Sequence, residues 1–498
     1  MPREWSDFLG RVKELAYLDQ IASQLYWDEE TYMPPGAVQD RALQKAALQG
    51  IIHERLTSKA MGSLLRSLKK NKHLTPDQRV IVREVDRRYT RAVRIPRELV
   101  KELARTESLA VEAWVRARRE KSFPVFQPLL KKMMGLKKKV AEHVGYEERP
   151  YDALLDEYEP YMKSSEVEAL FSRLRERLVP LASRILSAAG EARDSFMKGD
   201  YPEERQRDFV VEVVKRIGYD MNKGRVDVAP HPFTSGGNRD VRITIRYTKD
   251  DVRPAIFAAI HEAGHGMYEQ GFLEKHYHTP LAEPVSLGIH ESQSRLWENF
   301  IGRSLPFWRF WLPGLKERFP HLAPVSVEDF HRAVNTVRRS FIRVEADEVT
   351  YNLHIMLRFE VESAIFGGRL KIDEVPNFWN ERFESYLGIK VPDDSQGCLQ
   401  DIHWSIGAVG YFPTYTLGNI YAAQLYYKLR KDVPDMEERV AAGDFAPVLG
   451  WLRENVHRHG KRYRAKELIE RVTGEGLNEE RLLGYLREKY GELYGVSL

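Results

Sequence analysis

Residues 240–268 read DVRITIRYTKDDVRPAIFAAIHEAGHGMY and pass from one hydrophobic period to another. Over the first seven residues apolar and polar side chains alternate, which places Val241, Ile243 and Ile245 on one face of a β-strand. Beyond Pro254 the apolar residues are continuous enough for a buried helix. A strand with one packed face therefore leads into a helix.

The start of that helix is also marked in the sequence. Thr248 followed three residues later by Asp251 predicts a capping box, and Pro254 suits a first helical turn. We expect the helix to run to about Gly271.

Away from this segment the chain is predicted to be mainly α-helical. Residues 5–145 and 164–217, and the chain from 248 to 498, carry apolar residues at three- and four-residue spacing, interrupted by short Pro and Gly breaks. Only residues 224–247 combine turn residues with alternation, so one small sheet is expected. With 498 residues the chain exceeds the size of one usual core, and we expect a helical lobe over 1–200 and a second over 201–498 that carries the sheet.

Composition excludes several classes of protein. Lys and Arg total 77 against 73 Asp and Glu, a formal net charge of +4 with the two signs interleaved, so no nucleic acid partner is implied. No segment reaches the roughly 20 apolar residues of a membrane span, so no membrane partner is expected. Cys398 is the single cysteine, which rules out an intramolecular disulfide and fits a cytoplasmic location. The many interspersed Glu, Lys and Arg residues are compatible with a thermostable protein.

The motif His261-Glu262-Ala263-Gly264-His265 places two histidines one helical turn apart. Two neutral imidazoles can bind one Zn²⁺ at about 2.0–2.1 Å without cancelling its charge, so the ion still acidifies a water molecule. Glu262 beside them can take the proton from that water. The alternative is a pair of ordinary histidines on a helix, but the helical context favours a metal site.

A third ligand must come from another element. The six residues after His265 contain no histidine, which excludes the metzincin arrangement. Glu291, on a second helix that Ser286 would cap, is the preferred ligand, and a two-His, one-Glu set is typical of catalytic zinc sites. His290 competes with it, while Glu269 and Glu283 are weaker candidates. The alternative is that Glu291 pairs only with Arg295, four residues further along the helix.

Six segments together resemble the carboxypeptidase Taq family of cytosolic metallocarboxypeptidases. They are His231-Pro232-Phe233, Asp240-Val241-Arg242-Ile243-Thr244, the 261–265 motif, His290-Glu291-Ser292, Ile342-Arg343-Val344-Glu345-Ala346-Asp347 and Gly397-Cys398-Leu399-Gln400-Asp401-Ile402-His403-Trp404. The resemblance implies a neurolysin-like helical fold with a long central cleft, the small sheet at its rim, the metal on its floor and the N-terminal lobe covering it. It also implies removal of C-terminal residues from peptides with broad tolerance, one zinc or cobalt ion, and a homodimer. It assigns metal ligation to His261, His265 and Glu291, and catalysis to Glu262.

A carboxypeptidase needs a group that binds the terminal carboxylate of its substrate, and a bidentate arginine suits this task. Arg343 is our first candidate because it lies in one of the six segments. Arg242 and Arg246 follow, since their strand face could line the cleft. Each of these arginines could instead serve a structural ion pair.

The developing oxyanion requires donors close to the metal. His231, His403 and Tyr415 are the candidates, each with a structural alternative: a packed turn, an interfacial ring or a core tyrosine. Asp347 and Asp401 are expected to orient the metal-binding histidines.

Two other functions remain open at this point. An oligopeptidase with the same motif would cleave internal bonds. A helical scaffold would hold a structural metal, or none, and hydrolyse nothing.

Overall fold

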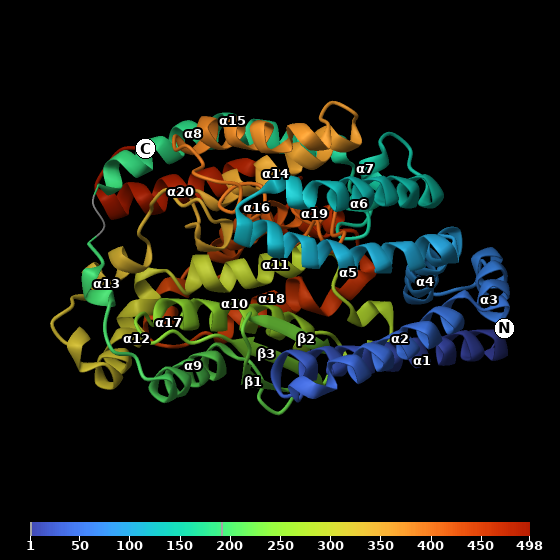
Figure 1. The fold of residues 1–498 in the computed structure, drawn as a ribbon. Helices are drawn as coiled ribbons and strands as arrows, with labels where there is room; N and C mark the ends of the chain where they lie inside the picture. Colours follow the sequence, from blue (N-terminus) through green and yellow to red (C-terminus); the bar gives the residue numbers. More distant parts are fainter. Residues whose placement is uncertain (1, 191–192) are drawn as a thin grey trace.

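The computed structural model describes residues 2–190 and 193–498 and confirms a mainly helical protein with one small sheet (Figure 1). The helices before the sheet are α1 (Pro2–Thr31), α2 (Val38–Thr57), α3 (Lys59–Lys70), α4 (Pro76–Arg94), α5 (Arg97–Glu120), α6 (Phe123–Val144), α7 (Pro150–Leu155), α8 (Ser164–Ala189) and α9 (Glu203–Ile217). Those after it are α10 (Arg253–Gln270), α11 (Leu287–Arg295), α12 (Leu305–Arg318), α13 (Val327–Val334), α14 (Tyr351–Phe366), α15 (Val375–Leu387), α16 (Pro413–Asp432), α17 (Met436–Ala441), α18 (Ala446–Asn455), α19 (Ala465–Thr473) and α20 (Glu479–Tyr494). Among the described residues no helix is both long and apolar enough to cross a membrane.

The sheet contains β1 (Gly224–Val228), β2 (Phe233–Gly237) and β3 (Asp240–Ile245), with β3 in the centre. β1 pairs with β3 in parallel and β2 pairs with it antiparallel. Val241, Ile243 and Ile245 are all fully buried, which confirms the packed face predicted from the alternation. Both β2 and β3 contact α10, so the sheet lies directly against the helix that carries the histidine motif.

The predicted capping box at the start of α10 is wrong. The helix begins at Arg253, one residue after Val252 at the N-cap position. The Thr248 hydroxyl donates to the Asp251 carbonyl at 2.6 Å, and the Asp251 carboxylate accepts from the backbone N–H of Arg253 at 2.9 Å. Because the Asp251 carboxylate also binds the guanidinium of Arg253, it is not available to reach back to Thr248. Pro254 does lie in the first turn, as expected.

Helices α1–α4 have a hydrophobic core of their own, from Phe8 to Val85, and among the described residues Leu281 joins it from the rest of the chain. α1 lies beside the sheet, with the ring centroid of Tyr26 5.0 Å from that of Phe233. The buried apolar residues from Leu99 onward form a second, larger core. The two-lobe division at residue 200 stays a prediction.

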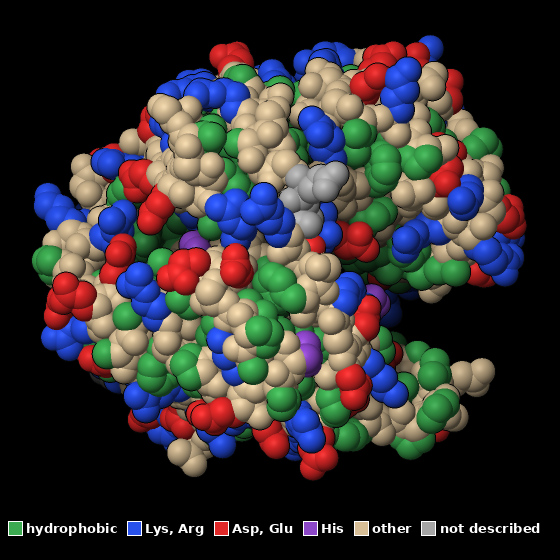
Figure 2. Space-filling view, turned by 90° about the vertical axis from the view of Figure 1, so that its left-hand side faces the viewer, with side chains coloured by type: hydrophobic (Ala, Val, Ile, Leu, Met, Phe, Trp, Pro, Cys, Tyr) green, Lys and Arg blue, Asp and Glu red, His purple; other side chains and the backbone are tan. Residues whose placement is uncertain are grey.

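A space-filling view shows the molecule hollowed at one edge, where a deep notch separates a larger upper part from a smaller lower part (Figure 2). The long central cleft with the metal on its floor stays a prediction.

Candidate metal centre

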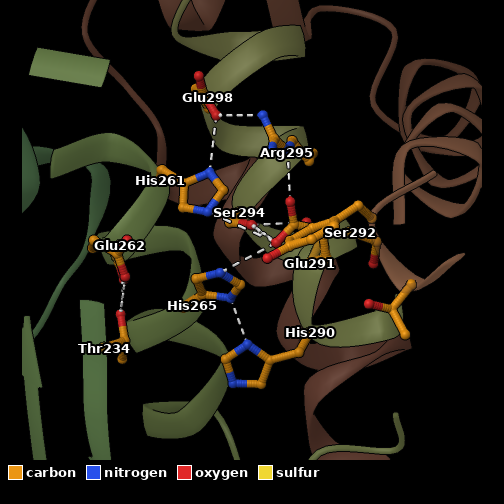
Figure 3. Close-up of polar contacts among 12 residues, drawn as sticks. Thr234, His261, Glu262, His265, His290, Glu291, Ser292, Ser294, Arg295 and Glu298 are labelled. Atoms are coloured by element: carbon orange, nitrogen blue, oxygen red, sulfur yellow. Dashed lines mark hydrogen bonds and ion pairs between the residues drawn. The ribbon is translucent and has the colours of Figure 1, made fainter. Parts of the chain in front are cut away.

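The two motif histidines on α10 and a glutamate on α11 converge on one point (Figure 3). One ligand atom from each of His261, His265 and Glu291 lies within 4.8 Å of the others. Glu291 Oε2 is 3.8 Å from His261 Nε2 and 3.5 Å from His265 Nε2. Ligand atoms around a tetrahedral ion at ordinary bond lengths are about 3.4 Å apart. The donor set and its spacing therefore fit a divalent cation.

Two glycines allow this convergence because they bring backbones unusually close. A Cβ on Gly264 of α10 would lie 2.6 Å from the Cα of Ser294 on α11. A Cβ on Gly418 of α16 would lie 2.6 Å from Cγ of Glu291. α11 is thus packed tightly between α10 and α16, and its ligand has little room to move.

Glu291 uses its two oxygens differently. Oε1 accepts from Arg295 Nε at 2.6 Å, while Oε2 faces the two imidazoles. The alternative in which Glu291 only pairs with Arg295 is therefore wrong. Burial alone would raise the pKa of Glu291, but Arg295 and His261 outweigh it and hold that pKa well below its usual value. The carboxylate stays ionised, as a metal ligand must.

Each metal-facing histidine is oriented through its other ring nitrogen. His261 Nδ1 lies 2.9 Å from Glu298 Oε2. His265 Nδ1 contacts Nδ1 of His290 (Figure 3). Nε2 of His290 is 3.0 Å from Glu269 Oε1. His290 and Glu269, weighed above as third ligands, support His265 instead. Such contacts fix the ring orientation of metal-binding histidines.

Sequence reasoning missed Glu298, although a signal exists for it. Glu298 lies seven residues after Glu291, two helical turns along the same face, and a π-helix at Leu296–Ile301 continues α11 through it. The carboxylate of Glu283, the remaining candidate for the third ligand, forms a salt bridge with Lys461 instead.

Burial is the main cause that lowers the pKa of His265 to about 3, and the nearby His290 is the second cause, so the His265 imidazole is neutral.

Glu262 is buried beside the two histidines and turned toward the sheet. The hydroxyl of Thr234, on β2, donates to Glu262 Oε2 at 2.6 Å (Figure 3). Burial raises the pKa of Glu262 above its usual value, and His261 and the Thr234 hydrogen bond partly offset this. Thr234 was also missed, although it directly follows one of the six recognised segments.

Arg343 belongs to a buried cluster next to the metal-binding residues. Asp401 accepts from Arg343 Nε at 3.0 Å and from Arg358 Nε at 2.6 Å. Arg343 Nη1 donates to the Tyr351 hydroxyl at 3.0 Å, and the guanidinium of Arg295 lies 4.6 Å from the centroid of the Tyr351 ring. Two guanidinium groups thus share one carboxylate and leave net positive charge one side chain away from the metal-binding residues.

Two of the three oxyanion candidates lie together at this cluster. His403 Nε2 is 3.3 Å from the Tyr415 hydroxyl, and the guanidinium of Arg343 lies 5.1 Å from the centroid of the Tyr415 ring. Burial lowers the pKa of His403 to about 4, so it is neutral, and burial raises the pKa of Tyr415 well above its usual value, so it keeps its proton. Tyr411, which the sequence did not single out, packs against both rings, edge-on to His403 and tilted relative to Tyr415.

The other candidates lie elsewhere. Arg242 binds Asp240 through two hydrogen bonds of 2.8 Å and its guanidinium lies 4.2 Å from the ring centroid of Trp27, so it forms the structural ion pair given above as its alternative, and a role in substrate binding stays a prediction. Arg246 is exposed just beyond the end of β3. His231 is exposed before β2, and its carbonyl accepts from Thr244. Roles for Arg246 and His231 in the site remain predictions.

The expectation that Asp347 and Asp401 orient the histidines is wrong. Asp347 accepts from the backbone N–H groups of Val349 and Thr350 and so shapes the turn before α14. Asp401 is held by two arginines.

Comparison with known proteins places this geometry in one family. Residues 7–490 match the carboxypeptidase Taq (M32) metallopeptidase family. The chain is 44% identical over 505 residues to thermostable carboxypeptidase 1 of Thermus thermophilus, covering 99% of both chains. It is 38% identical to carboxypeptidase 1 of Bacillus subtilis, covering 98% of both.

Comparison with solved structures identifies the same family. The crystal structure of an M32 carboxypeptidase from Deinococcus radiodurans superposes with a TM-score of 0.97 at 41% identity, covering 99% of this chain and 100% of that one. Metallocarboxypeptidase 1 of Trypanosoma cruzi superposes with a TM-score of 0.95 at 32% identity, covering 98% and 100%. The chain therefore belongs to the carboxypeptidase Taq (M32) family of metallopeptidases.

Proposed function

We propose that this metallocarboxypeptidase removes residues one at a time from the C-terminus of peptides, with a divalent cation held by His261, His265 and Glu291. The observation that carries the proposal is the convergence of these three side chains within 4.8 Å from two helices. When bound, a cation of this kind would polarise the scissile carbonyl and lower the pKa of a water molecule toward about 7.

Glu262 acts as the general base in this proposal. It takes a proton from the attacking water and delivers it to the leaving amine. The Thr234 hydroxyl, 2.6 Å from Glu262 Oε2, holds the carboxylate in place between these two transfers. Burial keeps the pKa of Glu262 above that of an ordinary glutamate, which makes it a better proton acceptor.

Arg343 binds the terminal carboxylate of the substrate. The single negative charge of Asp401 neutralises only one of the two positive charges on Arg343 and Arg358. The carboxylate of a bound substrate would supply the second negative charge and so stabilise the cluster. Tyr415 and His403, which touch each other beside Arg343, are suited to donate to the oxyanion. This net positive charge favours an exopeptidase over an oligopeptidase that cuts internal bonds.

Time-resolved mass spectrometry on a peptide and on its C-terminally amidated form tests the direction of cleavage. We expect a ladder of products shortened from the C-terminus of the free peptide and almost no cleavage of the amide, because the amide offers Arg343 no carboxylate. Internal cleavage of both peptides would instead indicate an oligopeptidase. Chelation that changes stability with no hydrolysis to lose would indicate a scaffold.

We propose four further properties of this protein. Zinc is the preferred ion, with cobalt as the alternative, because two imidazoles and one carboxylate suit both. Thermostability is proposed from the charged composition and from a similar protein named thermostable carboxypeptidase 1 in Pyrococcus furiosus. A homodimer and a cytoplasmic location rest on the family resemblance and the single cysteine. Metal analysis, thermal unfolding, light scattering and cell fractionation test them in turn.

A further inference from the structure

A buried carboxylate outside the metal centre holds the start of the helix that carries Glu291. Glu159 lies in the turn between α7 and α8 and is fully buried. Its Oε1 accepts from the hydroxyls of Ser286 at 3.0 Å and Tyr421 at 2.9 Å. Its Oε2 accepts from the backbone N–H of Gly288 at 3.0 Å.

The first N–H groups of α11 show what this contact does. The N–H groups at the start of a helix have no partner within it and need one from outside. Leu287 N–H donates to the Tyr158 carbonyl at 2.9 Å, Gly288 N–H to Glu159, and Ile289 N–H to the Ser286 hydroxyl at 3.0 Å. Two of the three acceptors therefore come from residues 158–159, far away in the sequence.

The fit at this point is too close to allow much displacement. A Cβ on Gly288 would lie 2.6 Å from Glu159 Oε2 and 2.9 Å from Cε2 of Tyr421. Glu291 follows Gly288 by three residues, less than one turn, so any shift of the helix start reaches the ligand. Gly418, three residues before Tyr421 on α16, confines the Glu291 side chain.

We propose that Glu159 is a positioning residue for the metal centre: its carboxylate anchors the N-terminus of α11 and so sets where Glu291 meets His261 and His265. The effect of this positioning on catalysis rests on the proposed function. A negative charge at a helix N-terminus is also stabilised by the helix dipole. Burial raises the pKa of Glu159 to about 7, with Tyr421, Ser286 and Gly288 lowering it, so the group is ionised in mildly alkaline solution.

Glu159→Gln tests the proposal because it keeps the shape of the side chain and removes the charge. Its matched control is Glu362→Gln. Glu362 is likewise fully buried, has a pKa raised by burial to about 7 and accepts three hydrogen bonds, but from Tyr151, Trp404 and Gly410 rather than from α11. Zn²⁺ affinity is measured by competition with a chelator at about pH 8.5, where both wild-type carboxylates are ionised. Amide hydrogen exchange of residues 287–291 is measured on the metal-free proteins.

We expect Glu159→Gln to weaken Zn²⁺ binding about tenfold and to speed exchange at 287–291, while Glu362→Gln changes neither. Wild-type values in Glu159→Gln, or equal changes in both variants, would overturn the proposal. Neither readout requires hydrolysis, so a wild type that binds Zn²⁺ but cleaves no peptide would refute the proposed function and leave this comparison intact.

A milder pair of variants covers the case in which Glu159→Gln does not fold. Ser286→Ala removes the hydroxyl that joins Glu159 to α11, and Ser304→Ala removes the equivalent N-cap hydroxyl of α12, which accepts from Phe307 N–H at 3.3 Å. We expect weaker Zn²⁺ binding only for Ser286→Ala. Equal affinities in the two variants would overturn the proposal.

Discussion

Glu262 is the side chain on which hydrolysis depends most directly. Glu262→Gln keeps the volume and the Thr234 contact but cannot accept a proton, so we expect kcat to fall about 10²–10⁴-fold. The three ligands are untouched, so the metal content should equal that of the wild type. Steady-state kinetics and metal analysis on the same preparation check both. Wild-type turnover with full metal content would refute the base assignment.

Arg343 and Arg242 form a matched pair for the binding of the terminal carboxylate. Arg343→Met should lower kcat/KM about 10²-fold, mainly through KM, because a charged hydrogen bond of about 1.5–3 kcal/mol is lost. Asp401 keeps Arg358, so this variant should fold. Arg242→Met removes the ion pair with Asp240 and the cation–π contact with Trp27, neither of which lies at the metal-facing residues, and should leave KM unchanged. A larger rise in KM for Arg242→Met than for Arg343→Met would indicate that Arg242, and not Arg343, binds the terminal carboxylate.

At the scale of helices, the contact between α10 and α11 depends on Gly264. In Gly264→Ala the new Cβ would meet the backbone of α11 at 2.6 and 2.9 Å, and neither backbone can yield easily. We expect a loss of about 1–3 kcal/mol in the free energy of unfolding, together with weaker metal binding because the ligands separate. Urea unfolding and chelator competition measure these.

The control for this prediction is Gly450→Ala, within α18, where a Cβ would meet nothing within 4 Å. It should stabilise the protein by about 0.5–1 kcal/mol, the difference in helix propensity. Equal effects of the two variants would show that Gly264 is not a packing contact.

Glu362 of α14 accepts hydrogen bonds from Trp404 and Gly410 in the segment before α16. Because its pKa is shifted, we expect the free energy of unfolding to depend on pH through this residue. Its pKa is raised by burial from 4.5 to about 7 in the folded protein, so the folded state holds the proton more tightly. Its stabilising contribution is complete below about pH 4.5 and is lost as the pH rises through 7, by up to about 3 kcal/mol. Glu362→Gln cannot titrate, so the wild type should lose stability relative to this variant between pH 5 and pH 8. A difference in free energy of unfolding that stays constant over this range would contradict the assignment.

At the scale of the whole molecule, Leu281 of the main body helps to anchor the hydrophobic core of helices α1–α4. Leu281 is fully buried in their core. Leu281→Ala should cost about 2–5 kcal/mol and loosen α1–α4 before the rest unfolds. Limited proteolysis should then cut first within residues 2–94. Cleavage spread evenly along the chain would show that α1–α4 are not separately anchored.

From the sequence alone, the mainly helical class, the family and a candidate metal site of His261, His265 and Glu291 could be predicted, because hydrophobic period, the spacing of His261 and His265 and the six segments are local or recognisable patterns. The alternation predicted a strand over 240–246, which in the structure ends at Ile245, and the prediction failed at the capping of α10, where Arg253 competes for Asp251. Only the tertiary structure decided that His290 supports His265, that Glu298 orients His261 and that Glu159 holds α11. These contacts join residues 25 to 129 positions apart. Such distances depend on how helices pack, through glycines such as Gly264 and Gly418, and no local pattern encodes them.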